Sequence, residues 1–542
     1  MKLSKSKLIL SVSVIGWAVI AFILFGTASV DAANNSDSEE IYKKMRLFTE
    51  VFAKVKENYV DELSVEELID AAIDGMLDVA DPHTVYFNPD DFEKFTSSTQ
   101  GEFGGLGISI DKKGEYITVV SPIEGTPAYR MGILAGDKIS TVDGVSVVGM
   151  NTDESIKLMR GEPGTKVKIG ILRPGVKEMM EFEIIRDIIK INSVPYTFVT
   201  DEEIGYLRVR QFNKNTTTEL RASLDELEAE DIKGLLIDLR SNPGGLLTEA
   251  VNTVNEFIGK GKRVVFTKGR AYGTSEEFYT TYDVDHSGYP IVILVNEASA
   301  SASEIFAGSL QDYDRALVVG KTTFGKGSVQ RLFPLSNGNG VKVTTAKYYI
   351  NSGRCIHKDI NDELYKDPRV LSGEMTIEEI REIQDEAAEK SKDHIYYTEK
   401  GRVVYGGGGI TPDVEIEQSL LTDLGVELRR KNTIFDFTVD FMQEHEAEVT
   451  LDFEADAALI EEFFDFARSK EIEFTAEEVV EVYDWVKVSL ESGVIEKKFG
   501  NVEGYKRSIE HDTQLQEALQ LFQKYQSLDE MFEYSASLKE EI

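Results

Sequence analysis

The chain has 542 residues, 59 of them basic and 96 acidic, which gives a formal net charge of −37 at pH 7. A charge of this size repels a phosphate backbone, and no basic stripe with interleaved aromatic residues is present, so the sequence argues against nucleic acid as a partner. At this length we expect two to four domains, and the 42% hydrophobic share is typical of a folded protein.

The residues that bind metals most often are few and dispersed. Cys355 is the single cysteine, which excludes an intrachain disulfide and a multi-cysteine metal site. The six histidines are scattered, without a close pair that could bind one ion. We therefore expect no metal site.

Residues 1–38 are predicted to be a signal peptide or membrane anchor. Lys2, Lys5 and Lys7 precede an apolar run over residues 8–25, and small residues up to Ala32 follow as an acceptable cleavage site. The run is longer than a usual signal core and just long enough to span a bilayer. We predict an exported protein, periplasmic or anchored on the outer side of the cytoplasmic membrane, with cleavage favoured over a retained anchor.

Residues 39–95 are predicted to form a helical N-terminal segment. Apolar residues recur at helical spacing on both sides of a break at residues 58–61. Asp81-Pro82 is expected to stop the second helix, because the residue before a proline is pushed out of the helical region.

The sequence pattern changes over residues 96–188, which are predicted to form a small β-dominated module. Short β-rich runs alternate there with Gly and Pro, and one helix is expected near residues 153–160. The loop Gly105-Leu106-Gly107-Ile108 opens a strand, and its glycines let successive N–H groups face one point suited to a carboxylate. Such a loop can capture a peptide C-terminus while the next strand pairs with the peptide. An ordinary hairpin is the alternative for the loop alone. The runs G-T-P-A-Y-R-M-G-I-L-A-G-D-K-I and M-R-G-E-P-G-T-K-V nearby closely resemble the PDZ domain.

Strands and helices alternate over residues 189–418, which predicts an α/β core. Within it, an acidic helical stretch at about 357–400 is expected to be a surface insertion. Residues 419–542 are helical in period, acidic and almost free of Gly and Pro, so we expect a separate helical domain there.

Three serines, Ser299, Ser301 and Ser303, alternate with alanine at a predicted strand-to-helix turn. The run from Ser301 to Glu304 fits a capping box, in which the serine caps the helix and the glutamate reaches back. Capping and catalysis are compatible, because such a turn also exposes a nucleophilic oxygen beside helix N–H groups.

A nucleophilic serine needs a base. His286 is the one histidine near the α/β region, and no G-x-S-x-G turn is present, so a Ser-His-Asp arrangement has little support. Lys326 lies between Gly325 and Gly327, where burial would keep a lysine neutral; an exposed loop lysine is the alternative. For the oxyanion, the turn that ends in Gly244-Gly245 could supply an amide together with that of Ala302.

Six motifs in order resemble the C-terminal processing (tail-specific) proteases, which are serine peptidases with an embedded PDZ domain and a Ser-Lys pair. They are G-E-F-G-G-L-G-I, D-L-R-S-N-P-G-G, S-A-S-A-S-E-I, G-K-T-T-F-G-K-G-S-V-Q, V-T-T-A-K-Y-Y and G-G-I-T-P-D. In that family the middle serine, 25 residues before the lysine, is the nucleophile, which implies Ser301 with Lys326 as base. Gln330 would orient the lysine, and Ser299 and Ser303 would be turn and capping residues.

The resemblance implies a crotonase-like α/β sandwich and a serine endopeptidase, without a cofactor, that recognises the C-terminal tails of protein substrates through the PDZ loop. Arg160, in the PDZ-like module, is a candidate for coupling peptide binding to the active site. An ordinary solvated surface arginine is the alternative, and the sequence favours it. The partners expected are protein or peptide C-termini, with the C-terminal helices available for homo-oligomer or adaptor contacts. The rival hypothesis is a catalytically silent, PDZ-type adaptor.

Overall fold

The structure is a computed structural model that describes residues 35–540, apart from short gaps at 284–285, 287, 365–366, 377–378, 381, 385, 387–389, 391, 418 and 420. The chain divides into two compact units, Met1–Asp81 and Pro82–Ile542. The apolar run expected to direct export, residues 8–25, lies outside the described residues. Among the helices that are described, none is long and apolar enough to cross a membrane.

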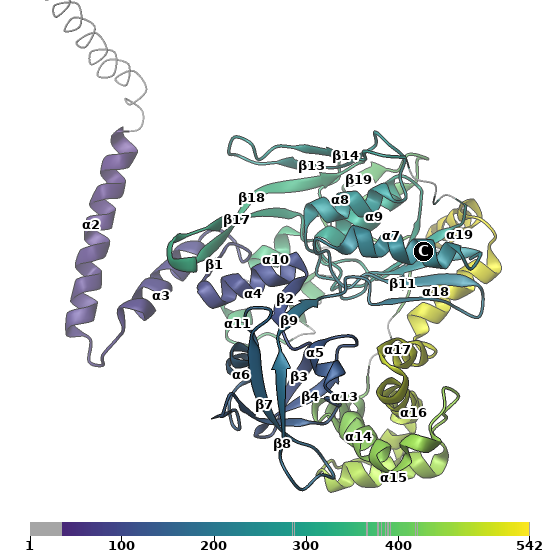
Figure 1. Ribbon diagram of the computed structural model, residues 1–542. Coiled ribbons are helices and arrows are strands. Elements are labelled where there is room, and N and C mark those ends of the chain that lie inside the picture. The colour runs from purple at the N-terminus through teal and green to yellow at the C-terminus, as the bar shows by residue number, and fades with distance from the viewer. Residues whose placement is uncertain are drawn as a thin grey trace, which may run out of the picture. The chain divides into compact units, whose positions relative to one another are not determined.

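From residue 35 on, where its description begins, the first unit contains two helices, α2 (Asn35–Asn58) and α3 (Val65–Leu77), drawn in purple in Figure 1. The predicted break between them is confirmed. A capping box starts α3: Ser64 accepts from the amide of Glu67, whose carboxylate accepts from the amide of Ser64. The helix ends at Leu77, four residues before Asp81, so the proline is not what stops it.

The α/β core is built on a six-stranded sheet of order β10-β11-β12-β15-β16-β21. All neighbours are parallel except β10 and β11. Strands β12 and β15 are buried along their whole length, as expected for parallel strands covered on both faces. The strands are β10 (Tyr196–Val199), β11 (Ile204–Arg208), β12 (Gly234–Asp238), β15 (Ile291–Val295), β16 (Leu317–Gly320) and β21 (Val414–Glu415).

A second, antiparallel sheet faces the first across two helices, α8 (Leu247–Asn255) and α9 (Ala302–Asp312), with α7 (Thr216–Glu228) beside them (Figure 1). Every residue of α9 is buried, because sheets cover it on two sides. The multidomain fold with an α/β sandwich core is therefore confirmed. The second sheet contains β1 (Val85–Phe87), β13 (Arg263–Lys268), β14 (Glu277–Tyr279), β17 (Ser328–Pro334) and β18 (Gly340–Ile350).

The β-module is an antiparallel sheet with its own apolar core, and its strands lie close to where the sequence predicts them. A two-stranded ladder of β2 (Glu102–Gly105) with β9 (Asp187–Lys190) connects it to the core, after helix α4 (Pro89–Gln100). Its elements are β3 (Ile108–Lys113), β4 (Tyr116–Pro122), α5 (Pro127–Arg130), β5 (Lys138–Val142), β6 (Val145–Ser146), α6 (Thr152–Met159), β7 (Lys166–Leu172) and β8 (Met180–Ile185).

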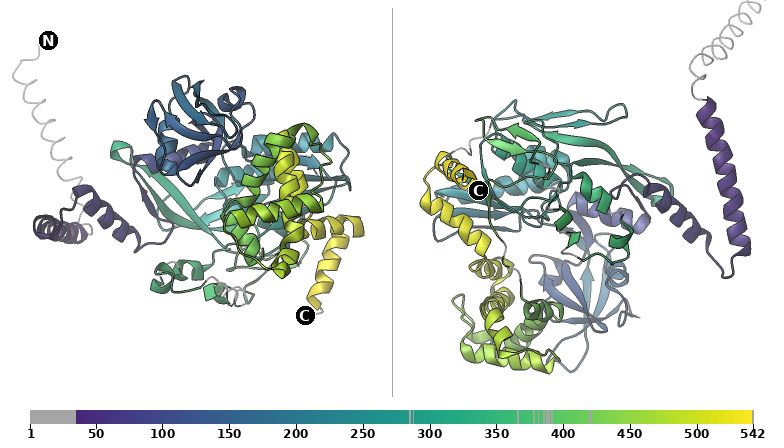
Figure 2. Two further views of the ribbon diagram at one scale, coloured as in Figure 1. Left: turned by 90° about the horizontal axis from the view of Figure 1, so that it is seen from below. Right: turned by 180° about the vertical axis from the view of Figure 1, so that it is seen from behind.

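The C-terminal helices do not form one separate domain, contrary to expectation. Helices α13 (Asp423–Arg430), α14 (Thr433–His445), α15 (Ala457–Ser469) and α16 (Ala476–Phe499) share one apolar cluster. After α17 (Asn501–Ile509), α18 (Thr513–Lys524) and α19 (Leu528–Glu540) instead pack against the six-stranded sheet (Figure 2). The physical reason is that the second face of this sheet is apolar and must also be buried.

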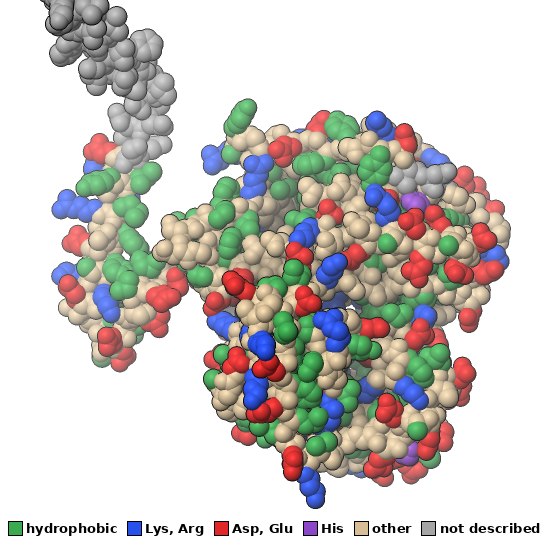
Figure 3. Space-filling view, viewed as in Figure 1, with side chains coloured by type: hydrophobic (Ala, Val, Ile, Leu, Met, Phe, Trp, Pro, Cys, Tyr) green, Lys and Arg blue, Asp and Glu red, His purple; other side chains and the backbone are tan. Residues whose placement is uncertain are grey.

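The expected insertion after residue 357 carries short helices, α10 (Asp359–Leu364) and α11 (Pro368–Leu371), and ends in the hairpin of β19 (Ile395–Tyr397) and β20 (Val403–Tyr405). On the face drawn in Figure 3, acidic and basic side chains are interspersed and no basic stripe is visible.

Candidate active site

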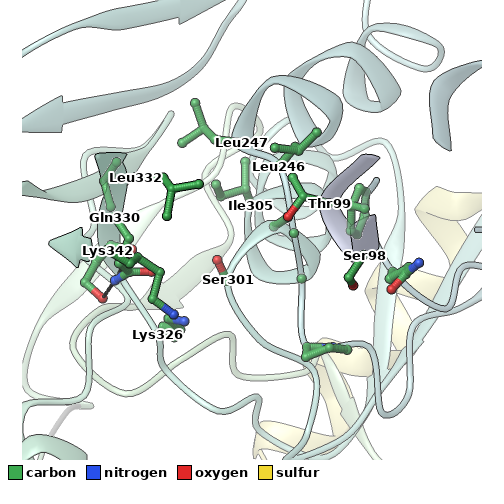
Figure 4. A pocket seen from close by; sticks show the side chains of 18 of the residues that line it. Ser98, Thr99, Leu246, Leu247, Ser301, Ile305, Lys326, Gln330, Leu332 and Lys342 are labelled. Carbon is green, nitrogen blue, oxygen red and sulfur yellow. Dashed lines mark hydrogen bonds between the residues drawn. The ribbon is translucent and has the colours of Figure 1, made fainter. Parts of the chain in front are cut away.

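Ser301 lies in the turn between β15 and α9, at the N-cap of the helix. Its backbone has φ 57° and ψ −112°, a conformation that a residue with a Cβ adopts only under strain, at a cost on the order of 1–3 kcal/mol. The strain places the side chain at a cavity of about 510 Å³ rather than in the core. Figure 4 shows its hydroxyl in the middle of this pocket.

The other two serines are fully buried, and their hydroxyls are used for structure. Ser299 donates to the carbonyl of Leu239 at 2.9 Å, and Ser303 donates to the carbonyl of Asn242 at 3.0 Å. They tie α9 to the end of β12 and to the turn that follows it. Of the three serines, only Ser301 is left at the pocket.

Lys326, in the loop between β16 and β17, lines the same pocket as Ser301 (Figure 4). No histidine is among the described residues that line it. His357, which the sequence places at the start of the insertion, does come close to the lysine loop, because its backbone packs against Gly327. Its ring nitrogen Nε2, however, faces the carboxylate of Asp359 at 3.4 Å. Lysine is therefore the candidate base that the geometry supports.

Glu304 is the buried residue that links the two candidates. Its carboxylate accepts from the backbone amides of Ser301 at 2.7 Å, Gly325 at 2.7 Å and Lys326 at 2.9 Å, and from the hydroxyl of Thr323 at 2.5 Å. Burial raises the pKa of Glu304, although these four donors act in the opposite direction. The predicted bond of the capping box to the Ser301 amide is thus present, but it is one of four.

The glycine turn after β12 lies directly against Ser301. A Cβ built on Gly244 would be 2.8 Å from the Cβ of Ser301 and 2.8 Å from the amide nitrogen of Ala302. The amide of Gly244 donates to the side chain of Asn242 at 2.9 Å, so it is already engaged. This leaves the amide of Gly245, together with that of Ala302, as the candidate oxyanion donors.

Gln330 lies on β17 and lines the pocket. Its amide nitrogen donates to the hydroxyl of Ser328 at 2.8 Å and to that of Thr344 at 3.3 Å. These bonds fix the side chain, and they use the nitrogen rather than the oxygen of the amide.

The pocket also has an apolar wall that the sequence did not reveal. Side chains of α8, α9 and β17 line it beside Ser301, and α4 closes another side with Ser98 and Thr99 (Figure 4). The apolar members labelled there are Leu246, Leu247, Ile305 and Leu332. They come from segments that are far apart in sequence, so only the fold could bring them together.

A second, smaller cavity of about 170 Å³ lies in the β-module and contains the predicted peptide-binding loop, Gly105-Leu106-Gly107-Ile108. The carbonyls of Leu106 and Gly107 are held by the amides of Ala128 at 3.0 Å and Ile123 at 2.8 Å. Gly107 has φ 78°, and a Cβ there would lie 2.2 Å from Thr126, so the turn requires glycine. Arg160 lines the same cavity, with its guanidinium 4.5 Å from the ring centroid of Phe103.

Three family models match the chain: peptidase family S41 at residues 203–365, the PDZ domain at 118–173 and the activating protease CtpB N-terminal domain at 23–91. The carboxy-terminal-processing protease of Bartonella bacilliformis is 40% identical over 325 residues, which cover 59% of this chain and 74% of the relative. The chain belongs to the carboxy-terminal processing protease family.

This carboxy-terminal processing protease is also 34% identical to CtpA of Bacillus subtilis over 352 residues, covering 65% of this chain and 74% of the relative. Among solved structures it matches the photosystem II D1 C-terminal processing protease at 31% identity, with a TM-score of 0.33, over 58% of this chain and 90% of that one. The matches to the peptidase family S41 and PDZ models and to the two sequence relatives show that the protein is a serine peptidase with an embedded PDZ domain, as the resemblance implied.

Sequence reasoning missed two buried residues beside the candidate active site. Glu304 was interpreted as a capping residue alone, and Tyr348 received no role. The signal for Tyr348 was its place in the motif V-T-T-A-K-Y-Y, but only the structure shows that its hydroxyl lies beside both Ser301 and Lys326.

Proposed function

We propose that the enzyme cleaves protein substrates by an acyl-enzyme mechanism in which Ser301 is the nucleophile and neutral Lys326 is the general base. The observation that supports this most strongly is the shared pocket: it contains Ser301, the strained serine of the three, and no histidine among its described residues. Two lysines line it, Lys326 and Lys342, and Lys326 is the one in the G-K-G motif that matches the family. Lysine can act as a base when its surroundings keep it neutral.

In the first step, Lys326 Nζ takes the hydroxyl proton while Ser301 Oγ bonds to the carbonyl carbon of the scissile peptide. The tetrahedral intermediate then breaks its C–N bond, and the lysine ammonium returns the proton to the leaving amine. Water, deprotonated by the same lysine, attacks the ester carbonyl. The C–O bond to Ser301 Oγ then breaks, the lysine ammonium returns its proton to Oγ, and the new carboxyl terminus is released. The amides of Gly245 and Ala302 would hold the oxyanion, helped by the N-terminal end of α9.

Gln330 would orient the lysine. Since its amide nitrogen is engaged by Ser328 and Thr344, the amide oxygen is the atom that can accept from Lys326. The apolar wall of Leu246, Leu247, Ile305 and Leu332 would hold a nonpolar substrate side chain beside Ser301.

Tail recognition would occur at the PDZ cavity. The loop from Gly105 to Ile108 would bind the terminal carboxylate, while Ile110, Ile156 and Met159 surround an apolar last side chain. Arg160, which lines this cavity, would couple the binding of a peptide in the cavity to the activity of the catalytic site. Normal tail-stimulated cleavage by Arg160→Ala would contradict that role.

The direct test is cleavage of an unstructured protein with an apolar C-terminal tail by wild type, Ser301→Ala and Lys326→Ala. We expect both variants to lose activity while circular dichroism shows intact folding. Ser309→Ala, which removes a buried hydroxyl further along α9, and Lys321→Ala, which removes a lysine paired with Glu415, are the matched controls and should cleave normally.

Two results would change the assignment. Cleavage by Ser301→Ala would show that the nucleophile is another residue. Tail binding by wild type without cleavage of any tail sequence would favour the adaptor hypothesis or a latent enzyme that needs an activator.

The enzyme would act outside the cytoplasm, periplasmic or on the outer side of the membrane, because three lysines and an apolar run open the sequence. Fractionation of cells that produce the full chain tests this, and N-terminal sequencing separates a cleaved signal from an anchor. The C-terminal helices would serve oligomer or adaptor contacts, since Leu451 and Val480 are apolar and exposed there. Light scattering of the purified chain with and without Val480→Asp tests the oligomer.

A further inference from the structure

We propose that Glu304 and Tyr348 are positioning residues that hold the backbones of Ser301 and Lys326 in one fixed relation. The inference rests on the catalytic roles proposed above for Ser301 and Lys326. It assigns to two buried side chains a role in the reaction, although neither would touch the substrate.

Glu304 acts on the backbone N–H groups of Ser301 and Lys326. Oε2 of Glu304 accepts from the amides of both Ser301 and Lys326, while Oε1 accepts from the amide of Gly325 and the hydroxyl of Thr323. An ionised carboxylate offers about four acceptor sites and no donor, so these four donors satisfy it completely. The site is therefore built for the ionised glutamate, in spite of its full burial.

Tyr348 acts on the backbone carbonyls of the same two residues. The hydroxyl of Tyr348, on β18, lies 3.1 Å from the carbonyl oxygen of Ser301 and 2.5 Å from that of Lys326. Tyr348 is fully buried, and burial holds the pKa of its hydroxyl well above the usual value, so the proton that it donates is retained. The carboxylate of Glu304 thus contacts the backbone nitrogens of Ser301 and Lys326, and the hydroxyl of Tyr348 contacts their backbone carbonyl oxygens.

The catalytic pair needs such support because its members lie on separate turns. Ser301 is held in a strained backbone conformation, and Lys326 is flanked by glycines, of which Gly325 has φ 86°. Neither turn fixes the distance between the two side chains by itself. A displacement of about 1 Å in a reacting group can cost on the order of 100-fold in rate.

The substitution Glu304→Gln keeps the size of the side chain but replaces one acceptor oxygen by an NH₂ group. That NH₂ would face N–H donors, because all four partners of Glu304 donate. Tyr348→Phe is milder: it removes the hydroxyl alone and leaves the carbonyl of Lys326 without this donor.

The experiment measures the rate at which a fluorophosphonate probe labels Ser301 in the full chain, together with kcat and KM for a tail-bearing substrate. We expect labelling and kcat to fall about 100-fold in Glu304→Gln and about 10-fold in Tyr348→Phe. KM and the affinity of the PDZ domain for a tail peptide should stay within about twofold, because neither residue reaches substrate. A purely structural defect would lower the amount of active enzyme and the melting temperature instead.

Two controls match the chemistry. Glu256→Gln changes another fully buried carboxylate of the core, bonded to Arg221 and Tyr282. Tyr313→Phe removes another hydroxyl that donates to a backbone carbonyl, that of Arg263 at 2.8 Å. Both should label at the wild-type rate.

Wild-type labelling by folded Glu304→Gln, or by Tyr348→Phe, would overturn the proposal. If Glu304→Gln does not fold, Tyr348→Phe decides the question alone. Equal losses in the test variants and in the controls would also overturn it, because the effect would then be general to buried polar groups. Labelling of Ser301→Ala would instead refute the nucleophile assignment, which is a separate failure.

Discussion

Arg240 and Asp512 form an ion pair with 2.7 Å between Nη2 and the carboxylate. Arg240 follows β12 and immediately precedes the turn that contains the candidate oxyanion glycines, whereas Asp512 is the N-cap of α18. Asp238 pairs with the same guanidinium at 2.8 Å. Helix α18 is therefore bonded to the edge of the sheet at which the candidate active site lies.

We expect Asp512→Asn to destabilise the protein by about 1–3 kcal/mol, because it removes one of two carboxylates from a guanidinium that is nearly buried. Urea unfolding measures the change. Asp529→Asn breaks the exposed pair with Lys400 and should change stability by about 1 kcal/mol or less. Equal effects of the two variants would show that burial of the Arg240 pair has no energetic consequence.

Asn242 is predicted to hold the oxyanion turn in shape. Its side chain accepts from the amide of Gly244 at 2.9 Å and donates to the carbonyl of Val209 at 2.8 Å. Asn242→Ala releases both, so we expect kcat to fall about 10- to 100-fold with little change in KM. The control Asn255→Ala removes an equally buried amide that bonds to Thr281 and Tyr282, and it should cost stability without a selective loss of kcat.

Alanine substitutions at two glycines of the PDZ domain distinguish the effect of backbone strain from that of a steric clash. Gly107 and Gly132 have φ 78° and 77°, but a Cβ on Gly107 would collide with Thr126, whereas nothing lies within 4 Å of one on Gly132. Gly107→Ala should abolish tail-peptide binding in calorimetry. Gly132→Ala should lower the free energy of unfolding by about 1 kcal/mol through backbone strain alone, and it should still bind the peptide. Binding by Gly107→Ala would show that the loop is not the peptide site.

Lys497 gives the helical region a pH dependence. It lies 4.7 Å from the ring centroid of Phe435 and donates to Thr438, and burial lowers its pKa to about 8. Between pH 8 and about 10.5 the unfolded chain binds a proton that the folded chain does not, so stability rises with pH in this window, by about 3 kcal/mol at most. Lys497→Met should remove this part of the rise of the unfolding free energy with pH, as measured by urea titrations at several pH values. An unchanged pH dependence in the variant would contradict the role of Lys497.

The amino-acid sequence predicted most elements of the core and of the PDZ domain, because their patterns are local. The apolar runs of β12 and β15 and the glycine-punctuated strands of the β-module can be recognised without tertiary contacts. The Ser301 and Lys326 candidates followed from the resemblance to the family's motifs. By contrast, α18 and α19 have the same helical period as α13 to α16, so the sequence could not show that they cover the sheet.

The sequence by itself determined the family and the chemistry to expect, because the motifs that match the family consist of residue types at fixed spacing. Through the same resemblance it predicted Ser301 and Lys326 as the pair that carries this chemistry. Only the tertiary structure decided which serine faces the pocket, which glycine amide is already engaged and which side chains surround the pair. Glu304 and Tyr348 belong to α9 and β18, and the bonds that they make at Ser301 and Lys326 arise only when the two sheets enclose α9. Burial and hydrogen bonding between distant segments have no local signature.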